Sequence, residues 1–157
     1  MPYDDDPSDP VLARLIAAHP ALFRGAAPVV SSHLPAGWYD LVDKLCHDIE
    51  STLGAEGCAS YEVRQVKSKF GALRFYWADR ELGATDVHID LIGSGALESV
   101  VQEIGPDDAK LERVRGLIRA AEQSSMTFCE TCGEPGTLMK PRGWYITRCA
   151  KHMSSGE

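Results

Sequence analysis

Residues 61–77 read YEVRQVKSKFGALRFYW and predict the centre of the fold, an antiparallel β-hairpin. Apolar and polar residues alternate in both halves, as in a strand with one buried face. Between the halves, the basic segment 67–72 contains a Phe-Gly step, where we expect the chain to turn. The positions that share a face are Tyr61, Val63 and Gln65 in the first half and Leu73, Phe75 and Trp77 in the second.

Segments with the apolar spacing of helices precede and follow this hairpin. The upstream helix is expected to begin near Gly37 and to end at Gly54. Its apolar stripe, at spacings typical of a helix, is Trp38, Leu41, Val42, Leu45, Ile49 and Leu53. The downstream helix covers residues 107–125, with the buried stripe Leu111, Val114, Ile118 and Ala121. A shorter helix begins near Pro10 with Ser8 as its cap, and Pro20 follows its end.

These segments predict an α+β fold in which helices pack on a small antiparallel sheet. Residues 87–91 alternate and are a candidate third strand, and residues 96–104 are a candidate helix. A chain of 157 residues forms one domain, or one domain with a small addition. We expect a body at residues 1–125, of which 1–7 are a frayed tail, and a zinc ribbon at residues 126–157.

The C-terminal part carries the most specific motif of the chain. Cys129 and Cys132 form a Cys-x2-Cys pair, and after sixteen further residues Cys149 and His152 form a Cys-x2-His pair. Two residues between paired ligands allow a tight turn that directs both side chains to one ion. The stretch between the pairs predicts a hairpin that returns the chain to the same place. The four residues therefore predict a closed Cys3His site for Zn²⁺.

A thioredoxin-like redox pair and an iron–sulfur site are the alternatives to zinc. A redox Cys-x-x-Cys pair normally opens a helix, whereas Gly133, Pro135 and Gly136 follow this pair and disfavour one. Zinc is therefore the predicted cofactor. Because the protein fills all four positions, none remains for an activated water, and we expect the ion to be structural and not catalytic.

Composition sets limits on function. The chain has 16 basic and 23 acidic residues, a formal net charge of -7, and Zn²⁺ held by three thiolates would change it to about -8. An acidic protein is repelled by the phosphate backbone, which favours a basic protein partner over nucleic acid. No apolar run approaches the roughly 20 residues of a membrane helix, and the acidic start lacks a signal-segment pattern. We expect a cytoplasmic protein, with Cys46 and Cys58 as buried thiols.

Two weaker patterns keep other functions open. The hairpin carries a basic and aromatic group of the kind that binds single strands, although parity places half of its rings in the core. This group comprises Lys67, Lys69, Arg74, Phe70, Phe75 and Tyr76. His88 and Asp90 alternate on the candidate third strand and would suit acid–base chemistry in an enzyme. No motif places a nucleophile or a second carboxylate beside them.

Several segments together resemble a set of small, largely uncharacterised proteins of bacteria and their phages. These proteins join a helix–hairpin–helix body to a C-terminal zinc ribbon. The resemblance covers residues 37–77 and 121–152, and it implies the same zinc ligands without implying a reaction. The segments that carry it are Gly37-Trp-Tyr-Asp-Leu, residues 63–76, Ala121-Glu-Gln-Ser, Cys-Glu-Thr-Cys-Gly-Glu-Pro-Gly, Gly143-Trp and Cys149-Ala-Lys-His152.

These observations favour a cytoplasmic, non-catalytic protein that works by binding a protein partner. An acidic protein of this size suits an immunity protein or antitoxin that neutralises a basic toxin. The alternative is an accessory protein associated with nucleic acid, and a third possibility is an enzyme built around His88 and Asp90. The candidate contacts to a basic partner are Asp40, Asp43, Asp48, Glu98, Glu103, Asp107 and Asp108.

Overall fold

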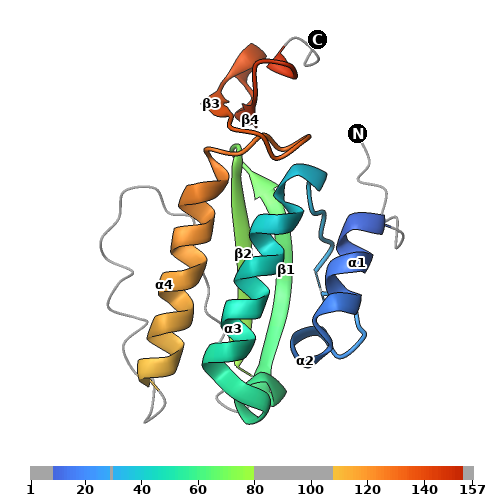
Figure 1. Ribbon diagram of the computed structural model, residues 1–157, viewed down its shortest axis with the longest axis vertical. Coiled ribbons are helices and arrows are strands. Elements are labelled where there is room, and N and C mark those ends of the chain that lie inside the picture. Colours follow the sequence, from blue (N-terminus) through green and yellow to red (C-terminus); the bar gives the residue numbers. More distant parts are fainter. Residues whose placement is uncertain (1–8, 29, 80–107, 154–157) are drawn as a thin grey trace.

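The computed structural model describes residues 9–28, 30–79 and 108–153. The body contains α1 (Pro10–Ala18), α2 (Pro20–Phe23), the 3-10 turn η1 (Ala36–Trp38), α3 (Tyr39–Ser60), β1 (Tyr61–Lys69), β2 (Ala72–Asp79) and α4 (Asp108–Ser125). The C-terminal ribbon contains β3 (Thr137–Met139), the 3-10 turn η3 (Pro141–Gly143) and β4 (Ile146–Arg148). In Figure 1, α3 lies over the β1–β2 hairpin, α4 lies on one side of it, and the ribbon lies at one end of the molecule. The predicted α+β class is confirmed.

The β1–β2 hairpin is antiparallel, as predicted, but its turn is tighter than the expected segment 67–72. Lys69 pairs with Ala72, so Phe70 and Gly71 alone form the turn. Their φ angles are 55° and 77°, and two successive positive φ angles are what a two-residue type I′ hairpin turn requires. Residues 67–69 therefore belong to the strand.

A β-bulge changes which residues of β1 face the core. Val63 pairs with Trp77 and Gln65 pairs with Tyr76, so Arg64 is an extra residue on β1. A bulge shifts the alternation by one position. As a result Val66 is buried where the sequence pattern had placed Gln65, which is half-buried. The predicted face of Tyr61 and Val63 is confirmed, as is that of Leu73, Phe75 and Trp77 on β2.

Neighbouring segments cover both edges of this two-stranded sheet. The loop after α2 follows the edge of β1, where Val30 N–H donates to the Arg64 carbonyl at 3.0 Å and His33 N–H to the Val66 carbonyl at 2.9 Å. On the β2 edge, Leu73 N–H donates to Ser125 Oγ of α4 at 2.8 Å. Strand edges with unpaired backbone groups are sites of unwanted pairing. These contacts protect the two strand edges. The bond from Leu73 also holds α4 along β2.

The helices largely follow the predicted stripes. In α4, Leu111, Val114, Ile118 and Ala121 are all buried. In α3, Gly54 leaves the helical conformation with φ 70° and ψ 178°, which is the predicted end of the stripe. The predicted end of the first helical segment is therefore confirmed, and a second helical segment follows directly and continues to Ser60.

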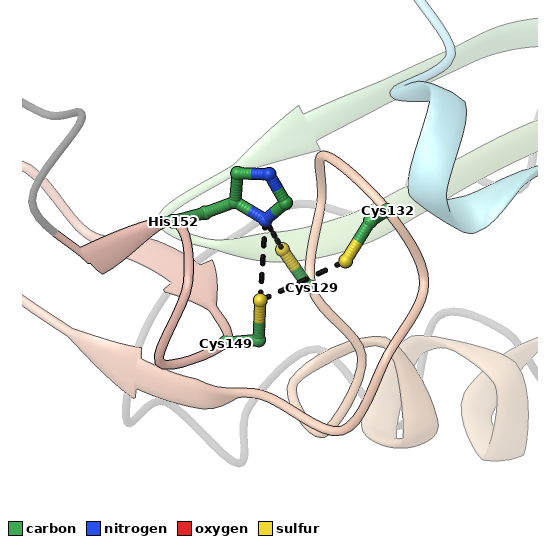
Figure 2. A group of neighbouring side chains, drawn as sticks. All are labelled: Cys129, Cys132, Cys149 and His152. Atoms are coloured by element: carbon green, nitrogen blue, oxygen red, sulfur yellow. Dashed lines mark hydrogen bonds between the residues drawn. The ribbon is translucent and has the colours of Figure 1, made fainter.

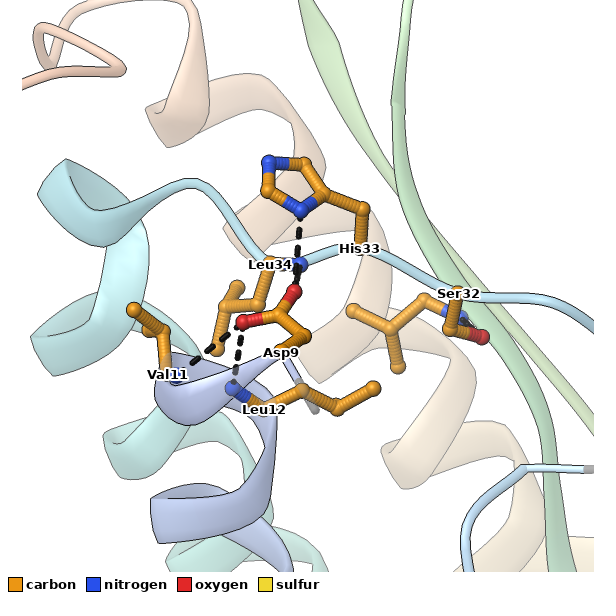
Figure 3. A network of polar contacts seen from close by, with 7 residues as sticks. Asp9, Val11, Leu12, Ser32, His33 and Leu34 are labelled. Carbon is orange, nitrogen blue, oxygen red and sulfur yellow. Dashed lines mark hydrogen bonds and ion pairs between the residues drawn. The ribbon is translucent and has the colours of Figure 1, made fainter. Parts of the chain in front are cut away.

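The start of α1 differs from the prediction in its cap. Asp9 is the N-cap, and its carboxylate accepts hydrogen bonds from Val11 N–H at 3.0 Å and Leu12 N–H at 3.1 Å. The same carboxylate also accepts a hydrogen bond from Leu34 N–H at 3.1 Å and lies 2.9 Å from the His33 ring (Figure 3). Asp9 therefore joins α1 to the loop that covers β1. Ser8, the predicted cap, lies outside the described residues, and Pro20 begins α2 directly after the end of α1.

One contiguous core holds these elements together. Trp38 and Leu45 of the upstream stripe are buried, and they belong to the same cluster as Leu73 and Phe75 of the hairpin. Within the described residues, none of the helices is both long and apolar enough to cross a membrane. The candidate strand at 87–91 and the candidate helix at 96–104 lie outside the described residues.

Candidate metal centre

The four predicted ligands meet in space. Their ligand atoms, three cysteine sulfurs and one imidazole nitrogen, all lie within 4.8 Å of one another. Figure 2 shows the side chains of Cys129, Cys132, Cys149 and His152 pointing toward a common centre from two segments of the ribbon. The predicted set of ligands is confirmed as a cluster that is able to hold a metal ion.

Two of the close distances between these atoms match the edges of a tetrahedral zinc site, and a third is shorter. Zinc–sulfur bonds of about 2.3 Å and zinc–nitrogen bonds of about 2.0–2.1 Å correspond to tetrahedral edges of about 3.8 Å between sulfurs and about 3.6 Å between sulfur and nitrogen. Cys132 Sγ lies 3.7 Å from Cys149 Sγ, and His152 Nδ1 lies 3.5 Å from Cys129 Sγ and 3.1 Å from Cys149 Sγ. The donor set, thiolate sulfur with one imidazole, is one that Zn²⁺ prefers.

Tight backbone turns position both ligand pairs. In the first pair, Gly133 N–H donates to the Cys129 carbonyl at 2.9 Å, and Gly133 has a φ of 79°, which favours glycine. In the second pair, His152 N–H donates to the Cys149 carbonyl at 3.1 Å. The antiparallel pairing of β3 with β4 returns the chain between them, as the sequence predicts.

The first cysteine lies in an environment that favours its thiolate. Burial opposes ionisation of Cys129, but backbone N–H groups of Cys149, Cys132 and Thr131 and the thiol of Cys149 outweigh it. Together they lower the pKa of the Cys129 thiol to about 6. Thiolates are the form in which cysteine binds metals. At Cys46, burial and the charges of Glu50 and Asp43 raise the pKa of the thiol well above its ordinary value.

The metal centre is fastened to the start of α3. Gly37 N–H donates to the Glu130 carbonyl at 2.9 Å, and Trp38 Nε1 donates to the Phe128 carbonyl at 2.9 Å. The approach is so close that a Cβ on Gly37 would lie 2.0 Å from the carbonyl oxygen of Cys129. Only glycine fits at this contact. Sequence reasoning assigned Gly37 to the start of a helix and did not foresee its role at the centre.

Glu130 links the same cysteine turn to the hairpin and to β4. One carboxylate oxygen accepts from Ser68 Oγ at 2.6 Å, and the other accepts from Thr147 N–H at 3.0 Å. The Thr147 hydroxyl is buried and donates to the carbonyl of Gly71 in the hairpin turn at 2.7 Å. The ribbon therefore contacts the body at two places, the start of α3 and the hairpin turn.

The predicted acidic contacts are only partly accessible. Asp40 is exposed in the first turn of α3. Asp43 lies 2.7 Å from Nε2 of the buried His19, whose other ring nitrogen contacts Glu50, and Asp48 pairs with Lys44 at 2.8 Å. Asp108 is the first residue of α4. Glu98, Glu103 and Asp107 lie outside the described residues, as do His88 and Asp90 of the enzyme hypothesis.

The predicted basic and aromatic group is divided by the hairpin. Phe75 is buried and Tyr76 is half-buried, whereas Phe70 is exposed at the turn. Phe70 instead meets Tyr145 of the ribbon edge-on, with ring centroids 6.4 Å apart. Sequence reasoning missed Trp144 and Tyr145 as surface residues, although an aromatic pair directly after a turn glycine was a usable signal.

Three comparisons with known proteins find no match. No family model, no curated protein and no solved structure is similar to this chain. The resemblance to small bacterial and phage proteins, and the division into a body and a ribbon, therefore remain predictions.

Proposed function

We propose that the chain is a non-catalytic binding protein whose ribbon is held by one structural Zn²⁺. The observation that carries the proposal is the cluster of Cys129, Cys132, Cys149 and His152, whose ligand atoms lie within 4.8 Å of one another, close enough to share one ion. Four protein ligands complete the preferred coordination of zinc. No position then remains at which the ion activates a water molecule, so it acts on folding.

The attachment of the ribbon supports a role in presenting a surface. Ribbons of this size bury little apolar area, so the metal supplies much of their stability. Here the first cysteine turn also bonds Gly37 and Trp38, and Thr147 bonds the hairpin turn. A metal-stabilised ribbon on a packed body holds exposed side chains in a fixed arrangement, which lowers the entropic cost of binding.

The distribution of charge favours the ribbon end for recognition of an anionic partner. Residues 65–75 and 126–153 contain seven basic and two acidic residues, whereas α3 contains five acidic and one basic. One of the two acids, Glu130, is bonded inside the structure. The ribbon end is therefore basic although the net charge of the chain is -7. A basic end favours a nucleic-acid-associated function over the immunity or antitoxin function expected from the sequence.

The second candidate is a cytoplasmic immunity protein or antitoxin that neutralises a basic toxin. The exposed Asp40 and the acidic composition of α3 favour it. It requires a basic protein from the native host to bind α3 tightly. Replacing Asp40 by Lys would then weaken that complex more than replacing Glu56, an exposed acid near the far end of α3.

Elemental analysis and chelation test the proposed zinc role. We expect one zinc per chain. We also expect a strong chelator to shift the NMR signals of residues 128–152 to random-coil positions, while the signals of the α3 core stay at their folded positions. This difference is expected because none of the four ligands belongs to the core cluster that contains Trp38 and Leu45. Metal-free protein with an unchanged spectrum, or iron in place of zinc, would contradict the proposal.

A further inference from the structure

The hairpin turn and the ribbon gather most of the exposed apolar side chains of the described residues. Six large hydrophobic side chains are exposed in ranges 9–28, 30–79 and 108–153. Five of them belong to the hairpin turn or the ribbon, and the sixth is Val30. Trp144 is 78% exposed and Phe70 is 52% exposed. We call the following residues the ribbon-end surface: Phe70, Leu138, Trp144 and Tyr145, with Lys69 and Lys140.

Contacts across two segments join the hairpin turn to the ribbon within this surface. Phe70 of the hairpin turn meets Tyr145 edge-on. A Cβ on Gly71 would lie 2.5 Å from Cδ1 of Leu138, so the turn is pressed against β3. Trp144 directly precedes Tyr145 in an extended segment, and its side chain is exposed. Aromatic rings from positions 70 and 145 therefore form one surface only after the ribbon docks.

Lysine ammonium groups lie over two of the rings. Lys69 Nζ is 5.5 Å from the ring centroid of Phe70, and Lys140 Nζ is 4.8 Å from that of Tyr145. Arg142 is exposed in η3, two positions before Trp144 in the chain. Ammonium groups that lie over aromatic rings place positive charge at these side chains, where it attracts an anion close to exposed rings.

The conformation of Phe70 adds a second observation. Its φ of 55° lies in the left-handed region, which a bulky residue adopts at a cost and which Asn or Gly adopts readily. The chain thus uses an unfavourable residue in the turn and exposes its ring to water. The turn requires this conformation, and residues held in such conformations cluster at functional sites.

We propose that the ribbon-end surface binds single-stranded nucleic acid, with bases stacking on Trp144, Phe70 and Tyr145 and phosphates meeting Lys69 and Lys140. This inference rests on the proposed function, because the ribbon must be folded on the body to form the surface. Single strands expose planar bases and carry a phosphate for each base, so they use both the rings and the cations.

Other partner classes use only half of the surface. An apolar protein partner would cover the rings and would have to remove water from the ammonium groups of the lysines, which is costly. An acidic protein would meet the lysines, but stacking on an exposed indole contributes little to it. A duplex hides its base faces within the stack. The combination of exposed rings and neighbouring cations is therefore best matched by a single strand.

Fluorescence anisotropy with the full-length, zinc-loaded protein tests this proposal. The probes are fluorescein-labelled oligo(dT) and oligo(U) of about 20 nucleotides, sized to span one ssDNA-binding site, and a duplex of the same length. We expect saturable binding of at least one single strand, weaker binding of the duplex, and loss of affinity as salt increases. For single strands the logarithmic salt slope should fall by about 0.7 when Lys140 is replaced by Ala.

Matched variants separate stacking from charge. Trp144→Leu keeps apolar volume but removes the ring, and we expect affinity to fall about 5- to 150-fold, the range for loss of one stacked base. Trp144→Phe keeps a ring and should retain most of the affinity. The control for Lys140→Ala is Lys110→Ala, an exposed lysine at the start of α4, which should leave the salt slope unchanged.

Three results would overturn the inference. The first is no anisotropy change at protein concentrations on the order of 100 μM in low salt, where even non-specific binders respond. The second is binding that Trp144→Leu does not weaken. The third is displacement of the oligonucleotide by polyglutamate at equal charge concentration, which would indicate an acidic protein partner. Zinc content and the NMR spectrum, measured on the same samples, report separately on the proposed structural role of the metal.

Discussion

The indole nitrogen of Trp38 lies 2.9 Å from the carbonyl oxygen of Phe128, although 90 positions separate the two residues. Trp38 is completely buried at the start of α3, and Phe128 directly precedes the first metal cysteine. This hydrogen bond joins the hydrophobic core of the body to the metal centre. The ribbon is therefore packed on the body and is not a separate appendage on a free linker.

Replacing Trp38 by Phe should destabilise the protein. The change removes the indole donor and leaves the Phe128 carbonyl without this partner, at a cost of about 1–3 kcal/mol, and the smaller ring adds a packing loss. Chemical denaturation measures the free energy of unfolding. Trp144→Phe is the control, since Trp144 is exposed, and it should change that free energy by less than about 0.5 kcal/mol. Equal effects of the two variants would contradict the contact.

Replacing Gly37 by Ala should disturb the docking of the ribbon. The new methyl group would lie 2.0 Å from the Cys129 carbonyl and 2.8 Å from the Cys132 nitrogen, which are backbone atoms that cannot move aside alone. We expect a loss of about 1–3 kcal/mol or more, with shifted NMR signals for residues 129–133. Thermal melting and NMR check this.

Gly116→Ala is the matched control for that variant. Gly116 lies in α4, and a Cβ there would meet nothing within 4 Å. Alanine favours the helix, so we expect the free energy of unfolding to rise by about 0.4–1 kcal/mol. If Gly37→Ala leaves the free energy of unfolding unchanged while Gly116→Ala raises it, the close approach at Gly37 is absent in solution.

Replacing Cys132 by Ala should release the metal and unfold the ribbon. Three remaining ligands do not complete the coordination of zinc, and the metal contributes much of the folding free energy of so small a unit. Elemental analysis should find little zinc, and far-UV circular dichroism should retain the helical signal of the body. Cys58→Ala is the control: Cys58 is buried far along the chain from the centre, and this variant should keep one zinc.

Replacing Phe70 by Asn should separate stability from binding. Asn tolerates the left-handed conformation, and the relief offsets the loss of the edge-on contact with Tyr145. We expect the free energy of unfolding to change by less than about 1 kcal/mol, while affinity for a single strand falls several-fold. Denaturation and anisotropy on one preparation measure both. If the variant binds a single strand as tightly as the parent protein, Phe70 does not contribute to the binding surface.

The sequence alone predicted the features that depend on local spacing. Helical stripes gave the buried faces of α3 and α4, because residues three and four apart share a face. Alternation predicted the buried residues of β2. The Cys-x2-Cys and Cys-x2-His pairs identified the ligand cluster, since two intervening residues bring both side chains to one ion whatever the rest of the fold.

Only the tertiary structure decided the features that join distant segments. The bulge at Arg64 exchanges Gln65 for Val66 in the core, and its position depends on pairing with β2 and on packing below it. The fit of Gly37 against the cysteine turn and the meeting of Phe70 with Tyr145 depend on where the ribbon docks. No periodicity records such contacts, because they arise from the close packing of surfaces whose residues are far apart in the chain.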